Sequence, residues 1–246
     1  MTKQAKTFDE VVKLRRSIRK YDPNKPIDVN LVKHCIEQAV LAPNSSNMQL
    51  WEFHHITNLE LLKKISKYCF DQSSAETAQQ LVIVVVRKDL WRKRAKANLT
   101  HINKVAGGKD PKDYNRREKF ANTYYTKLIP ITYFDFLGIF GWIKYIIYWM
   151  IGLFRPIYRQ ARTSDMRIVA HKSAGLAAQT FMLAMKNVGY DTCPMEGTDT
   201  LRIKKALNLP YGAEINMVIS CGIQIPDGVF GERFRIPFEE VYMKWE

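Results

Sequence analysis

Cysteine is scarce in this chain, and its four copies form no recognisable pattern. Cys35, Cys69, Cys193 and Cys221 lie far apart in the 246 residues, and no two of them form a CxxC pair. This spacing matches neither a disulfide framework nor a zinc site, and it fits a reducing compartment best. Residues 1–6 are polar and lead directly into a helical pattern, so we expect no signal peptide and a cytoplasmic protein.

Common catalytic motifs are also missing. No HExxH, GxSxG or paired-cysteine motif involves any of the five histidines, which argues against a metalloenzyme or a hydrolase. We therefore expect no metal. No GxGxxG motif follows an expected strand, so the sequence contains no site typical of a tightly bound dinucleotide.

Acidic residues are few, since 24 Asp and Glu oppose 38 Lys and Arg and leave a formal charge of +14. Between residues 87 and 119, twelve basic residues face four acidic ones. A nucleic-acid patch is one interpretation, but no recognition helix, RNA-binding signature or zinc finger accompanies the charge. We favour a solvated helical surface that also attracts anionic cofactors, and we expect no nucleic-acid partner. An apolar segment follows, so an anionic membrane surface is the better unusual partner.

The sequence has no uninterrupted apolar run of the length that crosses a membrane. Residues 129–157 come near the 20 or so apolar residues that a span needs, but three glycines and Lys144 interrupt them. We weigh a lid over a ligand, a dimer interface, and an anchor lying on a membrane surface. The lid or the interface is favoured, and peripheral membrane contact through 129–157 stays open because Trp142 and Trp149 resemble an aromatic belt.

The remaining pattern is that of one globular domain. Hydrophobic residues make up 46% of the chain and charged residues 25%, an ordinary globular balance. Helices and strands follow one another without strict alternation, which favours an α+β sandwich over a doubly wound fold. The spacing predicts helices over 8–16, 28–41, 59–68 and 165–188, and strands over 51–56, 81–86 and 214–222.

Four short segments suit one anionic, planar ligand. Residues 15–19 and 233–237 carry arginines, whose guanidinium forks bind phosphate bidentately. Residues 42–51 offer hydroxyl and amide groups that donate and accept hydrogen bonds. Residues 193–197 place a glycine where a backbone amide could approach a flat ring closely. A phosphate at one end and a hydrogen-bonding ring at the other describe flavin mononucleotide, FMN.

With these four segments in this order, the chain resembles the nitroreductase family of FMN-dependent NAD(P)H oxidoreductases, from about Phe8 to Val241. The resemblance implies an α+β three-layer sandwich, with a mixed central sheet flanked by helices. It also implies an intertwined homodimer that exchanges its C-terminal tails. We expect a single domain over 1–246, with a hydrophobic insertion at about 128–158. Leu50 stands where the family commonly has proline, a small departure.

The resemblance implies a role for each segment. Arg15 and Ser17 would hold the phosphate or ribityl group, Arg16 would add contacts, and Arg19 would lie near the pyrimidine edge of the ring. The other residues implied to contact the flavin are Pro43, Ser45, Asn47, Pro194, Met195, Glu196, Gly197, Arg233 and Arg235.

Further implied contacts concern the flavin ring. Pro43, Ser45 and Asn47 would reach a flavin bound mainly by the other subunit, with Asn47 near the ring. The backbone of Glu196 and Gly197 would face flavin N5, so that no catalytic side chain is expected. The family often has a basic or amide side chain at the O2 end of the ring, and Gln72 is only a weak candidate for it.

The function implied by the resemblance is an NAD(P)H oxidoreductase with FMN at the dimer interface. NADH or NADPH would act as a transient reductant, and a nitroaromatic, quinone or similar small aromatic acceptor would follow in a ping-pong cycle. One alternative is a specialised chemistry of the family, such as reductive dehalogenation or flavin breakdown. Another is a membrane-peripheral protein that binds flavin without fast turnover.

Overall fold

The computed structural model describes residues 6–136 and 138–246, and its centre is a four-stranded sheet. The strands are β1 (Trp51–Ile56), β2 (Gln80–Val86), β3 (Asp191–Met195) and β4 (Glu214–Gly222). Their order is β1-β2-β4-β3, and every neighbouring pair is antiparallel. The expected mixed pairing is confined to one isolated parallel bridge, which joins Ser17 to Thr192 at the β3 edge.

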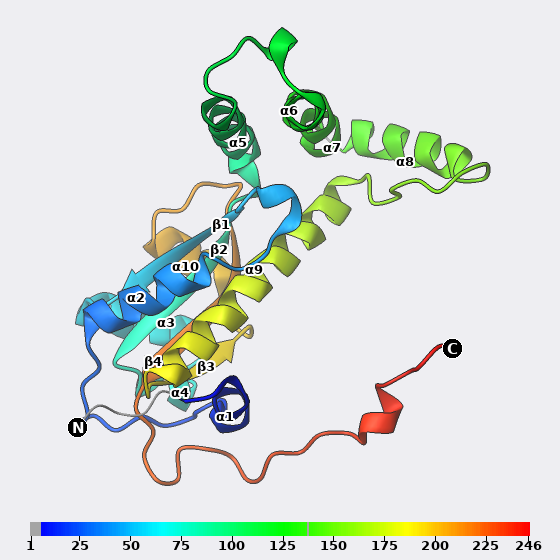
Figure 1. Ribbon diagram of the computed structural model, residues 1–246. Coiled ribbons are helices and arrows are strands. Elements are labelled where there is room, and N and C mark those ends of the chain that lie inside the picture. Colours follow the sequence, from blue (N-terminus) through cyan, green and yellow to red (C-terminus); the bar gives the residue numbers. More distant parts are fainter. Residues whose placement is uncertain (1–5, 137) are drawn as a thin grey trace.

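Helices cover both faces of this sheet, as the three-layer prediction requires (Figure 1). Side chains of β2 alternate between the faces, because successive residues of a strand point in opposite directions. Val82, Val84 and Val86 pack with α2 (Val29–Ala39) and α9 (Thr163–Asn187). The opposite face packs against α3 (Leu59–Tyr68), α4 (Ser73–Glu76) and α10 (Thr200–Ala206). All of β2 is buried, which explains why its sequence is apolar on both sides.

Helix α9 is the longest helix of the described chain, with 25 residues. Small alanines on its buried face let it lie close to the sheet, and Gly189, with φ of 91°, allows the left-handed turn beyond its last turn. At 1.5 Å per residue, it is about 37 Å long. It therefore connects two ends of the molecule that are far apart.

The chain between β2 and α9 forms a projecting lobe, residues 87–162 (Figure 1). It contains η2 (Lys88–Leu90), α5 (Trp91–Val105), η3 (Pro111–Asp113), α6 (Arg116–Thr123), the π-helical turn η4 (Tyr124–Leu128), α7 (Ile129–Tyr133) and α8 (Ile139–Ile151). The expected apolar insertion forms α7 and α8. Within residues 6–136 and 138–246, no helix combines the length and the apolar character that crossing a bilayer demands.

Helix α1 and the start of the C-terminal tail lie on the same side of the sheet (Figure 1). Helix α1 (Phe8–Leu14) begins at Thr7, which forms a reciprocal capping box with Glu10. After β4 the chain leaves the body as an extended tail with one short turn, η5 (Phe238–Glu240) (Figure 1). Residues 231–246 are all exposed, including several large apolar side chains.

Candidate functional site

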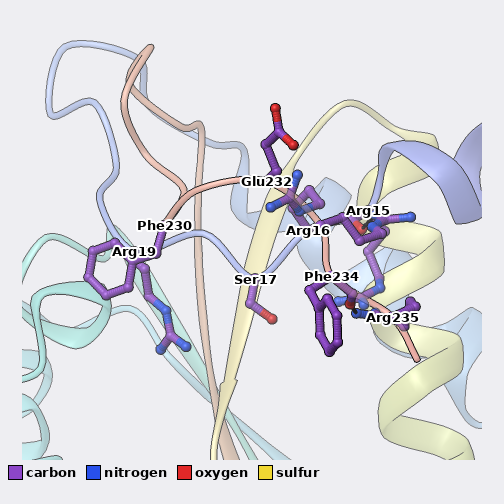
Figure 2. Close-up of a pocket in the computed structure, with 9 residues that line it drawn as sticks. Arg15, Arg16, Ser17, Arg19, Phe230, Glu232, Phe234 and Arg235 are labelled. Carbon is purple, nitrogen blue, oxygen red and sulfur yellow. Dashed lines mark hydrogen bonds between the residues drawn. The ribbon is translucent and has the colours of Figure 1, made fainter. Parts of the chain in front are cut away.

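The first and the last of the four segments form one pocket of about 190 Å³ (Figure 2). Ser17 lies between Arg19 on one side and a cluster of guanidinium groups on the other. The nine residues that line the pocket are Arg15, Arg16, Ser17, Arg19, Phe230, Glu232, Arg233, Phe234 and Arg235. Residues more than 200 positions apart in sequence thus meet at one site, and six of them are residues that the sequence had singled out.

Backbone hydrogen bonds fix residues 17–19 between β3 and the start of the tail. The Ile18 amide donates to the Thr192 carbonyl at 3.1 Å, and the Arg19 amide donates to the Gly228 carbonyl at 2.6 Å. The segment therefore runs as a short extended stretch along the free edge of β3. Its side chains are held at defined positions by pairing rather than by packing alone.

Two arginines attach the tail to the other side of the pocket. Arg16 Nη2 donates to the Gly231 carbonyl at 2.9 Å. Arg233 Nη2 donates to the carbonyls of Lys13 and Arg15, at 2.9 and 2.5 Å. The last carbonyls of a helix lack partners within the helix, so Arg233 also satisfies the end of α1. Arg235 bonds only to the carbonyl of its neighbour Phe234 among the described contacts, which leaves its charge directed at the pocket.

The pocket concentrates positive charge. Five guanidinium groups share it with one carboxylate, and within the described residues none of the five forms an ion pair. Burial lowers the pKa of Arg15, and repulsion from Arg233 and Arg235 lowers it further. Like charges held together in this way favour binding of an anion, because the anion removes their repulsion.

Arg19 stands apart from the cluster, above the ring of Phe230 at 5.6 Å from its centroid (Figure 2). Its Nη1 atom lies 3.5 Å from the Cys193 sulfur. Burial raises the pKa of that thiol, although Arg19 and Arg15 partly oppose the rise. Cys193 is therefore a protonated, buried group at neutral pH.

The third segment, residues 193–197, begins inside a strand. Pro194 and Met195 belong to β3, and only Glu196 and Gly197 lie beyond the end of the strand, where both are exposed. A proline fits there because β3 is an edge strand, where an amide can be missing without loss of a ladder bond. Gln72 Nε2 donates to the Gly197 carbonyl at 3.0 Å, so the weak candidate Gln72 does lie beside this segment.

The second segment lies far from the arginine pocket of the same chain. The Ser45 amide donates to Ser173 Oγ at 3.2 Å, and Asn47 Nδ2 donates to Asn98 Oδ1 at 3.0 Å. Ser173 lies in the first half of α9, whereas the pocket lies near its last turns; the 14 residues to Asn187 correspond to about 20 Å. One chain thus brings together three of the four segments and leaves Pro43, Ser45 and Asn47 exposed elsewhere.

The backbone of this second segment is unusual. Ser46, Asn47 and Gln49 all have positive φ, between 47° and 55°, although none is a glycine. Such conformations cost energy in L-residues and persist where surrounding bonds hold them, often at functional sites. Here Tyr124 shares a 2.6 Å hydrogen bond with Ser46 Oγ, and Tyr125 donates to the Ser46 carbonyl at 2.8 Å.

A second cavity, of about 260 Å³, opens beside this loop between the lobe and α9. Ser45 and the three tyrosines Tyr124, Tyr133 and Tyr158 contribute to its lining. Burial raises the pKa of Tyr133 to about 12, so its hydroxyl stays protonated and can donate. No motif in the sequence singles out these tyrosines, because they come from separate turns of the lobe and meet Ser45 only through the tertiary fold.

Helix α8 lies at the start of α9, where Gly141 packs against Thr163. Lys6, which precedes α1, bonds to the carbonyl of Lys186 at the other end of α9. No residue of α8 lines the arginine pocket of its own chain, and a lid over a ligand shared with a second chain stays a prediction. Phe230, Glu232 and Phe234 also line the pocket and were not expected there. For Phe234 the alternating Arg-Phe-Arg pattern of residues 233–235 was a usable signal.

Comparison with known proteins gives the family. A model of the nitroreductase family matches residues 12–223, which is most of the chain. The chain belongs to the nitroreductase family. It is 27% identical to 4-nitrobenzoate reductase of Pseudomonas putida, over 87% of this chain and 84% of that protein.

Solved structures of family members share the fold. A protein of Staphylococcus epidermidis assigned as an NAD(P)H:FMN oxidoreductase superposes with a TM-score of 0.70 at 18% identity, covering 100% of this chain and 99% of that one. A protein assigned as a nitroreductase from Exiguobacterium sibiricum, solved in complex with FMN, gives 0.67 at 23% identity and covers 100% of both chains. At these identities the likeness concerns the architecture alone.

Proposed function

We propose that this nitroreductase-family protein is an FMN-dependent NAD(P)H oxidoreductase that reduces nitroaromatics, quinones or similar electron-poor acceptors. The observation that carries the proposal is the arginine pocket, in which five guanidinium groups lie without a paired carboxylate. The similarity to 4-nitrobenzoate reductase supports the class of acceptor, and the structural neighbour assigned as an NAD(P)H:FMN oxidoreductase supports the reductant and the cofactor.

The residues present fit the phosphate end of FMN. A phosphate carries up to two negative charges and accepts several hydrogen bonds, which matches a cluster whose own repulsion lowers the pKa of Arg15. Arg15, Arg16, Ser17, Arg233 and Arg235 would hold this end. The small volume of the pocket, about 190 Å³, suits the phosphate and the adjoining part of the chain rather than a whole flavin.

The remainder of the cofactor would extend along β3 from this pocket. Arg19 offers positive charge beyond Ser17, and Pro194, Met195 and the backbone of Glu196 and Gly197 follow along the same strand. When bound, FMN would accept a hydride from NADH or NADPH and pass it to the acceptor, which gives ping-pong kinetics. Gln72, bonded to the Gly197 carbonyl, would keep this end of the strand in place.

A second copy of the chain would complete the site. Pro43, Ser45 and Asn47 lie beside the first half of α9, away from the pocket, which supports a homodimer in which this loop reaches the flavin held by the partner. The exposed apolar tail, residues 231–246, supports the same arrangement, since it has no cover in a single chain. The four buried, unpaired cysteines fit a cytoplasmic location.

The acceptor would occupy the tyrosine-lined cavity beside Ser45. Its volume of about 260 Å³ and its aromatic lining suit a small flat ring, because aromatic rings stack on one another and on a flavin. Protonated tyrosine hydroxyls would donate to a nitro or quinone oxygen. These chain groups bind and orient the acceptor, and none of them acts as an acid or base in the proposal.

The first test is the visible spectrum of the purified protein before and after anaerobic NADH and NADPH. Flavin bands that bleach are expected, followed by turnover with 4-nitrobenzoate or benzoquinone and parallel lines in initial-velocity plots. A colourless protein that also fails to take up added FMN would overturn the proposal.

Subunit mixing tests the shared site. We expect Arg15→Gln/Arg235→Gln and Asn47→Gly each to lose FMN-dependent activity as homodimers. Glycine is chosen at position 47 because the residue has positive φ, so no strain is added. Refolding the two variants together should restore about a quarter of the wild-type activity, because half of the dimers are mixed and each has one intact site. No recovery on mixing would place the whole site within one chain.

A further inference from the structure

Helix α8 is apolar around most of its circumference and is exposed. Its 13 residues contain one charged side chain, and its only buried residue among those described is Gly141. The outward stripe repeats at helical spacing over Ile139, Ile143, Ile146, Met150 and Leu153, and each of these side chains is about half exposed. Trp142 and Trp149 flank this stripe and are equally exposed. A monomer rarely leaves such a contiguous apolar surface uncovered.

The one charged residue of α8 does not interrupt this surface. Lys144 Nζ donates to the carbonyls of Ile131, Thr132 and Phe134, at 3.0 to 3.2 Å. It thereby caps the end of α7, whose last carbonyls lack partners within the helix. The charge is directed into the lobe, and the outer face of α8 stays uncharged.

The positive charge of the protein is concentrated in the same lobe. Residues 87–162 contain seventeen Lys and Arg against five Asp and Glu, which accounts for twelve of the fourteen net positive charges of the chain. The other 170 residues together have a net charge of only +2. The apolar helix and the basic excess occur in one projecting part of the molecule (Figure 1).

An open groove joins the basic helix α5 to the apolar surface. It has a volume of about 460 Å³ and lies between α5 and α7. Arg92 stacks 4.5 Å above the Trp91 ring and 6.0 Å from that of Phe134, and Phe134 lies 5.4 Å from Phe140 of α8. Lys96 also lines the groove. Cations therefore border directly on exposed aromatic rings.

We propose that this lobe docks on an anionic lipid bilayer, with α8 lying in the interface and α5 and α6 (Arg116–Thr123) above the headgroups. An amphipathic arrangement of aromatic and aliphatic side chains next to Lys and Arg suits such a surface. Helix α8 is about 20 Å long, too short for the roughly 30 Å hydrocarbon core, so it lies on the membrane rather than through it.

Charge distinguishes this occupant from two others. A second copy of the lobe would bring two strongly positive surfaces together, which is unfavourable. A nucleic acid would match the charge but would leave the apolar stripe of α8 in water. An anionic bilayer attracts the basic side chains of the lobe to its headgroups and also removes the apolar side chains of α8 from water.

Co-sedimentation of the full-length protein with vesicles tests the proposal. We expect binding to vesicles that contain phosphatidylglycerol and much weaker binding to vesicles of phosphatidylcholine alone. Binding to the anionic vesicles should fall as salt rises from about 0.1 to 1 M, since the screening length shrinks from about 10 to 3 Å. Equal affinity for both compositions would overturn the role of charge, and binding to neither would overturn the proposal.

Two pairs of exposed substitutions, each with a matched control, localise the contact. Ile146→Glu/Trp149→Glu should lower the affinity for anionic vesicles at least about 100-fold, because two apolar side chains would no longer enter the interface. Leu59→Glu/Leu201→Glu adds the same charge at exposed apolar positions on α3 and α10 and should have far less effect.

Arg92→Gln/Lys96→Gln should weaken binding by about fivefold per charge. The control Lys63→Gln/Lys64→Gln on α3 removes two charges outside the lobe. Each variant and its control must have the same melting temperature, which shows that both are folded.

The other occupants give different results. If the α8 variant changes the oligomeric state and leaves vesicle binding intact, a second copy covers α8 and the proposal is wrong. Salt-sensitive binding to a DNA duplex without vesicle binding would assign the basic lobe to nucleic acid and would also overturn it.

Discussion

Arg235→Gln separates binding of an anion from support of the fold. In the free protein, Arg235 bonds only to the carbonyl of the preceding residue, and its charge contributes to the lowered pKa of Arg15. Its removal takes away repulsion and no contact with another element. We therefore expect the melting temperature of the FMN-free protein to stay unchanged or rise slightly.

FMN binding should respond in the opposite direction. A hydrogen bond to a charged group contributes about 1.5–3 kcal/mol, so loss of one guanidinium should weaken FMN binding by about 10- to 100-fold. Fluorescence titration of the FMN-free protein measures this dissociation constant, and differential scanning fluorimetry without FMN measures the stability. Arg233→Gln is the contrasting variant: it should weaken FMN binding and also lower the stability of the FMN-free protein, because Arg233 also holds the carbonyls of Lys13 and Arg15.

Arg117→Gln provides the control, since Arg117 is an exposed arginine of the distant lobe. It should leave both quantities near their wild-type values. The reasoning is refuted if Arg235→Gln binds FMN as tightly as the wild type. It is also refuted if that variant destabilises the FMN-free protein as much as Arg233→Gln does.

Three further expectations concern the body of the protein. Gly222→Ala should lower the free energy of unfolding in urea by about 1–3 kcal/mol, because its Cβ would lie 2.6 Å from a buried tyrosine ring. Gly175→Ala in α9 meets no atom within 4 Å and should raise it by about 0.5–1 kcal/mol; similar effects of the two would contradict the packing described. Burial opposes ionisation of Glu214, but bonds from Arg167 and His171 outweigh it and lower the pKa below the ordinary 4.5. The stabilisation is therefore present above that pH and lost as the pH falls below it, so Glu214→Gln should flatten the acid side of a plot of melting temperature against pH. Burial raises the pKa of all four cysteine thiols, so Ellman's reagent at about pH 8 should modify none quickly until denaturant is added; one fast native thiol would argue against that burial.

Much of the fold follows from local patterns in the sequence. The strands Trp51–Ile56 and Glu214–Gly222 and the helix Leu59–Tyr68 agree with prediction at both ends. Their apolar spacing and turn residues act over short distances, which is why sequence reasoning works there. The strand β3 was missed, because Pro194 indicates a turn unless the strand is known to lie at an edge of the sheet. Edge position is a property of the whole sheet.

Part of the candidate site could likewise be predicted from local sequence, and part depends on tertiary packing. The chemistry of residues 15–19 and 233–235 indicated one anion site, and the structure brings them into one pocket. No local pattern could reveal that Ser45 and Asn47 lie at the other end of a 25-residue helix. Nor could it reveal that tyrosines of the lobe gather beside Ser45. Both facts depend on how α9 and the lobe pack together.

Helix α9 also sets a limit on how the length of this chain can change. An α-helix turns by 100° per residue, so one residue added or removed in its middle would rotate one end against the other by more than a quarter turn. The Ser45 loop contacts Ser173 in the first half of this helix, and Lys6, just before α1, contacts Lys186 in its last turn, so the relative orientation of the two regions depends on the length of helix between these contacts. Insertions in the loops of the lobe would leave that orientation unchanged. The helix therefore holds the two regions at a fixed distance and a fixed rotation. Insertions and deletions are expected in the loops around it and not within it.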